Sequence, residues 1–567
     1  MARTGHAYPQ VEPRAGALVD LRVVPAPAAV TVAEALTLAR PKRAEALVTG
    51  DRPGLVLRAD LHRAARLGLQ ALQAADLTRT VPRVSARDSE IVVRRHLLAG
   101  APAVLVMDGR SPLGAISRAL VQGGRALSVL TSHQLAWIGE PMFDLLTVVG
   151  HVATEANLRA FVVGGLVRDA LRVSTRRGPR PGPHARDVDL VVEGNGLELA
   201  ERLARRLGGR LRAHVAFGTA SIEGLAVGRL DVASARAERY RFPGALPDVR
   251  PGTILEDLER RDFSVNALAV ELSTGTFQLL DPLGGRRDLE HGRLRVLHPL
   301  AFVEDPTRIF RAARYATRLG LSLDRASWRA RTLAVRLEHY PALSGQRLAA
   351  ELTRVVTDHG PDLSLGWLAT AGAFRLLDSR LCFPRGSAPA VRGVADTLDW
   401  IGRRRVGADP LEVGLLAVLA SAPPAASEGA LTRLGLSGVP LARLRRVPPA
   451  VHALIRDVED LAPRSRLAAR LRGLSALELA EAWRQGTPRV RALLDWWVGE
   501  GAHVEPVLHG EDLIALGVRS GPAVGAARAR LRDARLDGTV STRDDEVTLV
   551  SHWIDSGGRS HPEDERT

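Results

Sequence analysis

One stretch, residues 161–192, limits most strongly what this chain of 567 residues can fold into. It opens with the apolar run Phe161–Val163, passes through Gly164 and Gly165, and continues as LVRDALRV, in which apolar residues recur at helical spacing. This order predicts a strand, a tight glycine turn and the start of a helix. Glycines let a backbone approach a ligand closely, and free N–H groups at a helix start favour phosphate. The turn is therefore a candidate phosphate-binding element.

The second feature of this stretch is a pair of carboxylates that leads into the apolar run LVV. Residues two apart on a strand share a face, so Asp187 and Asp189 point the same way and Val188 points to the core. Such a pair repels unless a cation lies between its members, and Mg²⁺ prefers one or two carboxylates plus phosphate oxygens. Alone, a D-x-D pattern is usually a solvated strand end and a glycine pair is a common turn. Together and in this order, they favour a site for nucleotidyl transfer.

Four motifs in the order found here resemble those of a known family. VGGLVRDALRV and RDVDLVV, within residues 161–192, resemble the head of the class II tRNA nucleotidyltransferases and bacterial poly(A) polymerases, of the polymerase-β-like superfamily. RRDFSVNAL (260–268), DPLGGRRDL (281–289) and FVEDPTRIFRAAR (302–314) resemble further motifs of that family. The resemblance spans residues 161–320. It implies attack of an RNA 3′-hydroxyl on the α-phosphorus of a nucleoside triphosphate, with release of pyrophosphate.

The resemblance also implies roles for residues. Asp187 and Asp189 would be the catalytic residues and would hold two Mg²⁺ ions. Asp305 and Arg308 would read the base, because a carboxylate and a guanidinium offer an acceptor and donors to a base edge. The implied nucleotide-binding residues are Gly164, Gly165, Arg168, Arg261, Asp305, Arg308, Arg311 and Arg314. The last three arginines are spaced by three, so we expect them on roughly one side of a helix, facing the triphosphate.

Two features near the carboxylate pair have alternative interpretations. Asp231 lies in the alternating run RLDVA and is a candidate third metal ligand, or it braces Arg236 or Arg239. The connector Ser174–Arg186 is rich in Pro, Gly and Arg, and it either contacts RNA backbone or is disordered.

The fold class that we predict is a multidomain chain with α/β, α+β and all-α parts. Residues 21–135 hold a weak duplication of a helix–strand–turn–strand–helix unit that resembles a pair of CBS repeats. Such pairs often bind adenine nucleotides, and the alternative is a structural module that spaces or dimerises the enzyme. The predicted domains are a loose N-terminus (1–20), the CBS-like pair (21–135), a polymerase-β-like nucleotidyltransferase head (136–300), a helical neck for base recognition (301–375) and a helical body and tail for RNA binding (376–567).

Composition narrows the class of partner. The formal net charge is +15, and all of the 78 basic residues except Lys42 are arginine, which suits a polyanionic partner. The single cysteine, Cys382, excludes a disulfide or a cysteine-based zinc site within one chain and fits a reducing cytoplasm. No uncharged apolar run approaches the ~20 residues that span a bilayer, and the first residues have no apolar core of a signal peptide.

We therefore expect a cytoplasmic tRNA nucleotidyltransferase that uses ATP, and CTP if it builds more than the last residue. The CBS-like pair and the loop YRFPGALPDV (240–249) resemble those of A-adding relatives, and this resemblance favours addition of the 3′-terminal A over the whole CCA end. A poly(A) polymerase or a CC-adding enzyme would share the same motifs. A hypothesis of a different class is a non-catalytic, nucleotide-sensing RNA-binding protein with a decayed head, against which the intact D-x-D pair argues.

Overall fold

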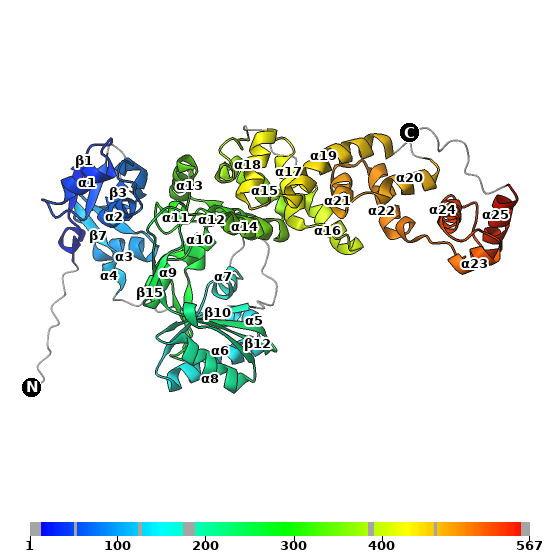
Figure 1. Cartoon of the computed structure of the whole chain (residues 1–567). Coiled ribbons are helices and arrows are strands. Elements are labelled where there is room, and N and C mark those ends of the chain that lie inside the picture. Colours follow the sequence, from blue (N-terminus) through cyan, green and yellow to red (C-terminus); the bar gives the residue numbers. More distant parts are fainter. Residues whose placement is uncertain are drawn as a thin grey trace, which may run out of the picture. The chain divides into compact units, whose positions relative to one another are not determined.

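The computed structural model describes residues 13–49, 54–122, 128–173, 187–338, 340–383, 391–458 and 462–556, so the connector Ser174–Arg186 lies outside the described residues. The chain divides into two compact units (Figure 1). The first unit comprises Met1–Glu351 and Trp367–Cys382, and the second comprises Leu352–Gly366 and Phe383–Thr567. The division at Glu351 falls inside the neck that the sequence predicts for residues 301–375.

The N-terminal module, residues 13–122, contains the same unit twice. In each copy a first strand pairs in parallel with a second, and the second pairs antiparallel with a third. The first copy consists of β1 (Val23–Ala26), α1 (Val32–Ala39), β2 (Ala46–Thr49), β3 (Gly54–Leu57) and α2 (Arg58–Arg66). The second consists of β5 (Arg83–Ser85), α3 (Glu90–Leu98), β6 (Ala103–Asp108), β7 (Ser111–Ser117) and α4 (Ala119–Gln122), with β4 (Arg79–Thr80) between the copies. The helix–strand–strand–helix order is thus as predicted, with one further strand before it in each copy.

The head is built on a sheet of eight strands, in the order β11-β12-β13-β10-β9-β16-β17-β8. The strands are β8 (Ser128–Val129), β9 (Arg159–Val163), β10 (Asp187–Glu193), β11 (Arg210–His214), β12 (Thr219–Leu225), β13 (Gly228–Ser234), β16 (Ala269–Glu271) and β17 (Gln278–Leu280). The central strands β9 and β10 bury continuous apolar runs, as strands covered on both faces do. Because β8 belongs to this sheet, the head begins before residue 136, the predicted boundary.

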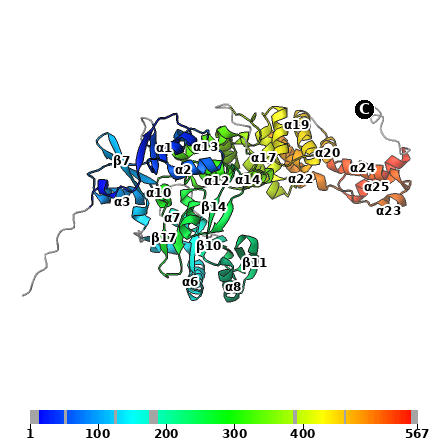
Figure 2. The same cartoon turned by 60° about the vertical axis from the view of Figure 1, so that its left-hand side comes forward.

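Several helices pack against the sheet of the head. The helices α6 (Glu140–Glu155) and α8 (Gly196–Leu207) pack together on one face of the sheet (Figures 1 and 2). The short helix α7 (Gly165–Arg172) follows β9 directly and contacts both β9 and β10. The remaining elements of the head are α5 (Ser132–Ile138), the hairpin β14 (Arg236–Arg239) and β15 (Asp248–Pro251), α9 (Ile254–Glu259), the 3₁₀ turn η4 (Ser264–Asn266), α10 (Gly285–Glu290) and β18 (Arg293–Leu294).

After residue 300 the chain is helical, as predicted, apart from the two-residue strand β19 (Ser322–Leu323). The neck elements are α11 (Ala301–Glu304), α12 (Thr307–Leu319), α13 (Arg325–Leu337) and α14 (Gly345–Thr357), followed by α15 (Pro361–Thr370). The later helices are α16 (Val394–Arg404), α17 (Pro410–Leu419), α18 (Pro424–Arg433), α19 (Val439–Val458), α20 (Arg464–Arg472), α21 (Ala476–Gln485), α22 (Pro488–Gly499), α23 (Gly510–Ala515), α24 (Pro522–Leu536) and α25 (Arg543–Asp555).

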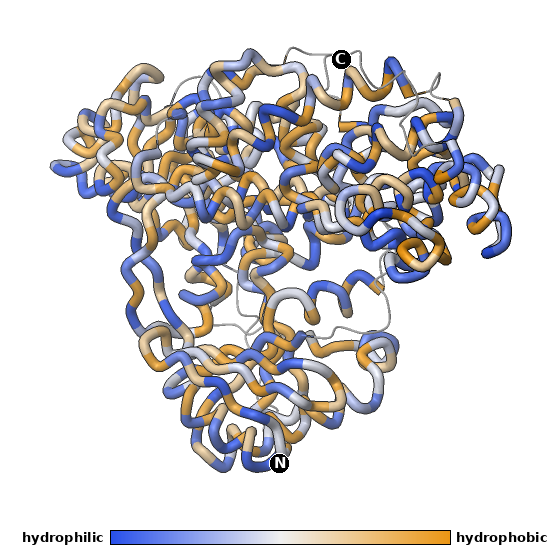
Figure 3. The backbone as a smooth tube through the Cα atoms, turned by 45° about the vertical axis from the view of Figure 1, so that its right-hand side comes forward, coloured by the Kyte–Doolittle hydropathy of each residue, from blue (hydrophilic) through white to orange (hydrophobic). Residues whose placement is uncertain are grey.

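Hydrophobic and hydrophilic residues alternate at short intervals along the backbone of both units (Figure 3). Among the helices that the structure describes, none combines the length and the apolar character that a membrane crossing requires.

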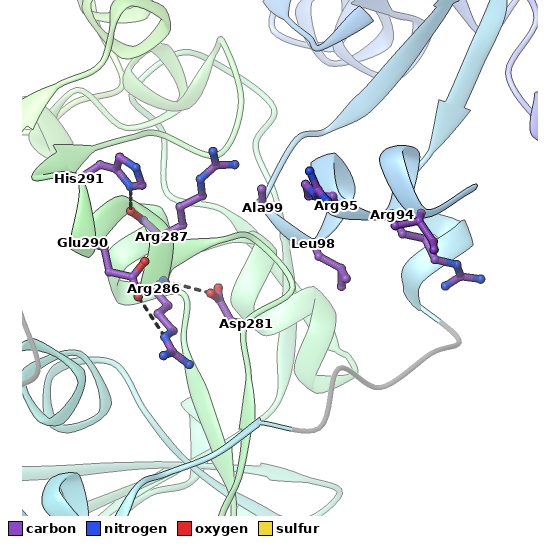
Figure 4. A pocket seen from close by; sticks show the side chains of 10 residues that line it. Arg94, Arg95, Leu98, Ala99, Asp281, Arg286, Arg287, Glu290 and His291 are labelled. Atoms are coloured by element: carbon purple, nitrogen blue, oxygen red, sulfur yellow. Dashed lines mark hydrogen bonds and ion pairs between the residues drawn. The ribbon is translucent and has the colours of Figure 1, made fainter. Parts of the chain in front are cut away.

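The N-terminal module packs against the head and neck within the first unit. The backbones meet closely at two glycines, since a Cβ on Gly284 would lie 2.6 Å from the Cα of Gly100. Beside this contact, α3 and α10 border a pocket of about 670 Å³, with Arg94 and Arg95 on one side and Arg286 on the other (Figure 4).

A second contact of the module is a buried charged cluster in the neck. Arg63 of α2 donates to Glu304 of α11 at 2.9 Å, and His298 lies 3.2 Å from the same Arg63 nitrogen. Burial, with the charge of Arg63 nearby, lowers the pKa of His298 to about 4. The neutral imidazole is therefore part of the folded state at neutral pH.

We expect this histidine to make the protein sensitive to acid. An unfolded histidine titrates near pH 6.5, so as the pH falls from about 6.5 to about 4 the unfolded chain binds a proton that the folded chain does not. The free energy of unfolding should fall across this window by up to about 3 kcal/mol from His298 alone. In thermal unfolding experiments, the stability of His298→Gln should fall less between pH 7 and 4.5 than the stability of the wild type. The exposed His452→Gln is the control, and equal slopes for all three proteins would contradict the prediction.

Candidate active site

The glycine turn lies where β9 ends and α7 begins. Gly164 has a φ of 69° and a ψ of −119°, a conformation that residues with a side chain avoid. A Cβ at this position would lie 3.3 Å from Nη1 of Arg261 and 3.8 Å from Oδ2 of Asp189. Gly164 thus permits the turn and also keeps open the gap between a guanidinium and a carboxylate. Around Gly165 there is more space, because its nearest neighbour is Nη2 of Arg168 at 3.8 Å.

The first of these glycines should tolerate substitution poorly. We expect Gly164→Ala to lower the free energy of unfolding by roughly 1–2 kcal/mol, the usual cost of a left-handed residue with a Cβ. It should also reduce turnover, because the methyl group enters the gap beside Asp189. Gly165→Ala is the matched control for stability, since its backbone φ is ordinary. Denaturant unfolding of both variants tests this, and equal stability of the two would contradict it.

The predicted carboxylate pair lies on one face of β10, with Val188 buried behind it. Across the parallel pairing with β13, Asp189 is aligned with Asp231, and Asp187 with Arg229. Arg229 donates to Asp231 at 3.0 Å and lies 3.7 Å from Asp187. The guanidinium of Arg229 therefore lies between the carboxylates of Asp187 and Asp231.

The structure gives the protein partners of Asp231, the candidate third metal ligand. Asp231 accepts hydrogen bonds from Ser221 and Arg229, whereas Arg236 pairs with Glu238. The predicted bracing of Arg236 or Arg239 is therefore not the arrangement found. Arg229 is the partner because residues two apart on β13 share its face.

The electrostatics of the pair suit a cation. Burial in the cavity raises the pKa of Asp189, and the carboxylates of Asp231 and Asp187 raise it further. Among the residues that the structure describes, no three His, Cys, Asp or Glu side chains are grouped as a complete metal site. A same-face carboxylate pair such as Asp187 and Asp189 would fit Mg²⁺, because this ion commonly completes its shell with water and substrate phosphate.

A cavity of about 730 Å³ lies beside these carboxylates. It has the size of a small-molecule site. The predicted residues that line it are Gly164, Gly165, Arg168, Asp189, Asp231, Arg261, Asp305, Arg308 and Arg311. Residues from separate motifs, far apart in sequence, therefore meet in one site.

Two predicted residues do not line this cavity, Asp187 and Arg314. Arg314 lies 3.7 Å from Glu351 instead. The helix explains this, since three-residue steps fall short of a full turn and Arg314 has rotated away from Arg308. The face of α12 that lines the cavity continues through Tyr315 and Arg318, neither of which we predicted.

Most of the lining arginines are held by protein acceptors. Arg168 is buried, binds Asp169 through two nitrogens at 2.9 and 2.8 Å, and donates to Asn266 at 2.8 Å. Arg261 donates to Asp257 at 3.0 Å. These bonds fix the side chains in place, and preorganised charge is what a phosphate site requires.

Asp262 organises the next layer of the site. It is buried and accepts hydrogen bonds from the backbone N–H of Phe263, from Asn266 and from Arg311, whose Nε is 2.8 Å away. The Asp262–Arg311 pair joins the head to α12. Sequence reasoning assigned no role to Asp262 or Asn266, although both lie in the motif 260–268.

The base-reading candidates are tied to the neck and to the β14–β15 loop. Asp305 accepts hydrogen bonds from Thr307, at the start of α12, and from Arg347 at 2.9 Å. Arg347 also donates to the carbonyl of Gly244 at 2.6 Å. Arg308 is buried and donates to the carbonyl of Arg260 at 2.9 Å. Arg347 is thus a site residue that sequence reasoning missed, because its partners are distant in the chain.

Comparison with known proteins places this site in a family. The model of the poly A polymerase head domain matches residues 160–295. A CC-adding tRNA nucleotidyltransferase of Deinococcus radiodurans is 34% identical over 402 residues, which cover 69% of this chain and 89% of the relative. The chain belongs to the class II tRNA nucleotidyltransferase and poly(A) polymerase family. This confirms the resemblance drawn from the motifs.

Two further members of this family show how the match extends. An A-adding tRNA nucleotidyltransferase of Geobacter sulfurreducens is 34% identical over 435 residues, 73% of this chain and 47% of the relative. The chain thus spans about half the length of this A-adding relative. The Thermotoga maritima CCA-adding enzyme, solved in complex with tRNA, superposes with a TM-score of 0.61 at 26% identity over 76% of this chain and 99% of that one.

Proposed function

We propose that this protein is a template-independent tRNA nucleotidyltransferase that adds the 3′-terminal A, or the CCA end, from ATP and CTP in the cytoplasm. The observation that carries the proposal is the same-face pair Asp187 and Asp189 beside a cavity lined by arginines from several motifs. Relatives named for A addition and for CC addition are equally similar at 34% identity, so CC addition is the second candidate.

The chain's own residues suit this reaction. Mg²⁺ at Asp187 and Asp189 would supply charge to activate the attacking hydroxyl and to stabilise the leaving pyrophosphate. Arg261 and Arg311 would hold triphosphate oxygens from positions that Asp257 and Asp262 already fix. Asp305 and Arg308 would present an acceptor and donors to the edge of the incoming base, in place of a template.

The proposal is tested by incubating the purified protein with tRNA transcripts that end before CCA, after C or after CC, each with one labelled nucleotide. An A-adding enzyme extends only the –CC transcript, with ATP. A CC-adding enzyme extends the two shorter transcripts with CTP, and a CCA-adding enzyme extends all three. Repeated addition of A to an unrelated RNA would identify a poly(A) polymerase. No incorporation with any substrate, while tRNA still binds, would support the non-catalytic alternative.

We further propose that the C-terminal helices provide much of the tRNA contact. The basic cluster Arg443, Arg445 and Arg446 does not carry this proposal, because each pairs with a glutamate. The support is the overall excess of arginine and the tRNA complex of the Thermotoga relative.

Affinity for tRNA should therefore fall steeply with salt. Each phosphate contact releases counterions, so several contacts predict a loss of about 10³-fold or more between 50 and 200 mM salt. Filter binding or fluorescence anisotropy over a salt series measures the slope. A flat series would contradict binding through arginine–phosphate contacts.

For the N-terminal module we propose either binding of an adenine nucleotide between the two copies or dimerisation through the pair. The support is the duplicated strand and helix order, which forms two similar halves. Sedimentation of the full chain with and without AMP or ATP distinguishes these two roles.

A further inference from the structure

A second cavity, of about 640 Å³, lies between the N-terminal module and the head and neck, and we call it the interdomain cleft. It is separate from the candidate active site, and none of the predicted catalytic or nucleotide-binding residues lines it. The module contributes Arg118, while the head and neck contribute Arg293, Arg325 and Arg329. Its size is that of a small-molecule site.

Three other arginines at the cleft already have carboxylate partners. Arg79 pairs with Asp60, Arg63 with Glu304, and Arg295 with Asp288. These pairs hold the walls of the cleft together. Asp60, Glu304 and Asp288 are thereby engaged by these arginines.

The remaining arginines of the cleft lack such partners. Within the described residues, Arg118, Arg293, Arg325 and Arg329 form no ion pair with a carboxylate. The acids that line the cleft are Asp76, which pairs with Arg336, together with Asp324 and Glu259. The side chain of Asp324 caps α13. Four guanidinium groups therefore face two carboxylates without an ion-pair partner, and the cleft has a positive excess.

Among these four arginines, Arg118 has the largest expected free-energy cost of burial. Its Nε and Nη2 are shielded from solvent and have no hydrogen-bond partner among the described residues. Burial lowers the pKa of Arg118 to about 10 and the charge of Arg295 contributes, although the carboxylates of Asp281 and Glu259 oppose the shift. A buried donor without an acceptor costs free energy, and so does a desolvated charge without a counter-ion. An anion in the cleft would relieve both costs.

The neighbouring pocket between α3 and α10 is also lined by arginines. There Arg94 pairs with Glu90, and Arg286 pairs with Glu290 at 3.2 Å (Figure 4). Its other two arginines, Arg95 and Arg287, form no ion pair with a carboxylate among the described residues. The shielded donors of Arg118 that lack an acceptor, rather than unpaired charge alone, therefore set the interdomain cleft apart.

We infer that the interdomain cleft binds the phosphate groups of a small polyphosphate, held between the module and the head. Several guanidinium groups from both walls match an anion with at least two linked phosphates, because each guanidinium offers two parallel N–H donors to phosphate oxygens. Free polyphosphate and the phosphate chain of a nucleotide share this chemistry. The inference concerns a site separate from the reacting nucleotide, so it does not depend on the proposed nucleotidyl transfer.

The test is titration calorimetry of the full-length protein with inorganic tripolyphosphate. Wild-type protein should show two classes of site, one in the candidate active site and one in the cleft. Arg118→Gln, from the module wall, and Arg329→Gln, from the neck wall, should each weaken the cleft class at least tenfold. Arg95→Gln, in the pocket of Figure 4, removes the same charge at the same junction and should change neither class. A single class of site that neither cleft variant alters would overturn the inference.

Titrations with other ligands identify which phosphate compound binds the interdomain cleft. ATP that binds the cleft class more tightly than tripolyphosphate points to a nucleotide, and equal affinity points to free polyphosphate; both support the inference. AMP that binds as tightly as ATP would overturn it, because a single phosphate would then suffice. Displacement of tripolyphosphate from the cleft by tRNA, with tRNA binding weakened in Arg118→Gln, would also overturn it and assign the cleft to RNA. Incorporation by Arg118→Gln on tRNA is measured in parallel, so that loss of the cleft site and failure of the proposed function are told apart.

Discussion

Replacing either Asp187 or Asp189 with asparagine should reduce nucleotide incorporation by about 10³-fold or more. Divalent metal ions contribute several kilocalories per mole of transition-state stabilisation, and a factor of ten in rate corresponds to about 1.4 kcal/mol. Asparagine keeps the shape of the side chain but removes the charge that holds the cation. The loss should appear in kcat, because the charge acts on the reacting phosphorus.

The structure offers a matched control for this experiment. Asp231 is aligned beside Asp189, but its oxygens already accept from Ser221 and Arg229. Asp231→Asn should therefore reduce turnover less than either member of the pair. Binding of tRNA and the thermal midpoint should stay near wild type in all three variants. Near-normal turnover of both Asp187→Asn and Asp189→Asn would show that the assignment of the catalytic pair is wrong.

Loss of the Asp305 carboxylate should relax the choice among the four nucleoside triphosphates by about 10- to 100-fold, which corresponds to about 1–3 kcal/mol. The base edge would lose an acceptor that the protein supplies in place of a template. Selectivity is measured as the ratio of kcat/KM for the preferred nucleotide to that for each competitor, with Asp305→Ala against the wild type.

A variant of Arg347 distinguishes contact of Asp305 with the base from an effect on the position of the Asp305 side chain. Its guanidinium joins Asp305 to the carbonyl of Gly244, so Arg347→Met leaves the carboxylate in place but removes its anchor. We expect this variant to lose selectivity in the same direction and to a smaller degree. If Asp305→Ala keeps wild-type selectivity, the residue is only a helix cap for α12 and its role in base reading is refuted.

Local pattern was enough to predict the centre of the site. Alternation along β10 places Asp187 and Asp189 on one face, because side chains on a strand alternate whatever the strand pairs with. The positive φ of Gly164 likewise follows from a tight turn between a strand and a helix, which only glycine enters readily. The predominance of helices among the described residues after 300 is similarly encoded in the spacing of the apolar residues.

The sequence did not predict which side chains form ion pairs and hydrogen bonds with one another, because these pairs depend on contacts between residues far apart in the chain. Arg347 binds Asp305 over 42 positions and the carbonyl of Gly244 over 103 positions. Arg63 reaches Glu304 over 241 positions, and the unpaired charge of Arg118 appears only once the module is packed on the head. The sequence by itself thus determined which groups share one face of a strand or lie at a turn, since strand and helix periodicity is local. The tertiary structure alone decided which charges are paired and which are left for a ligand, since packing sets those distances.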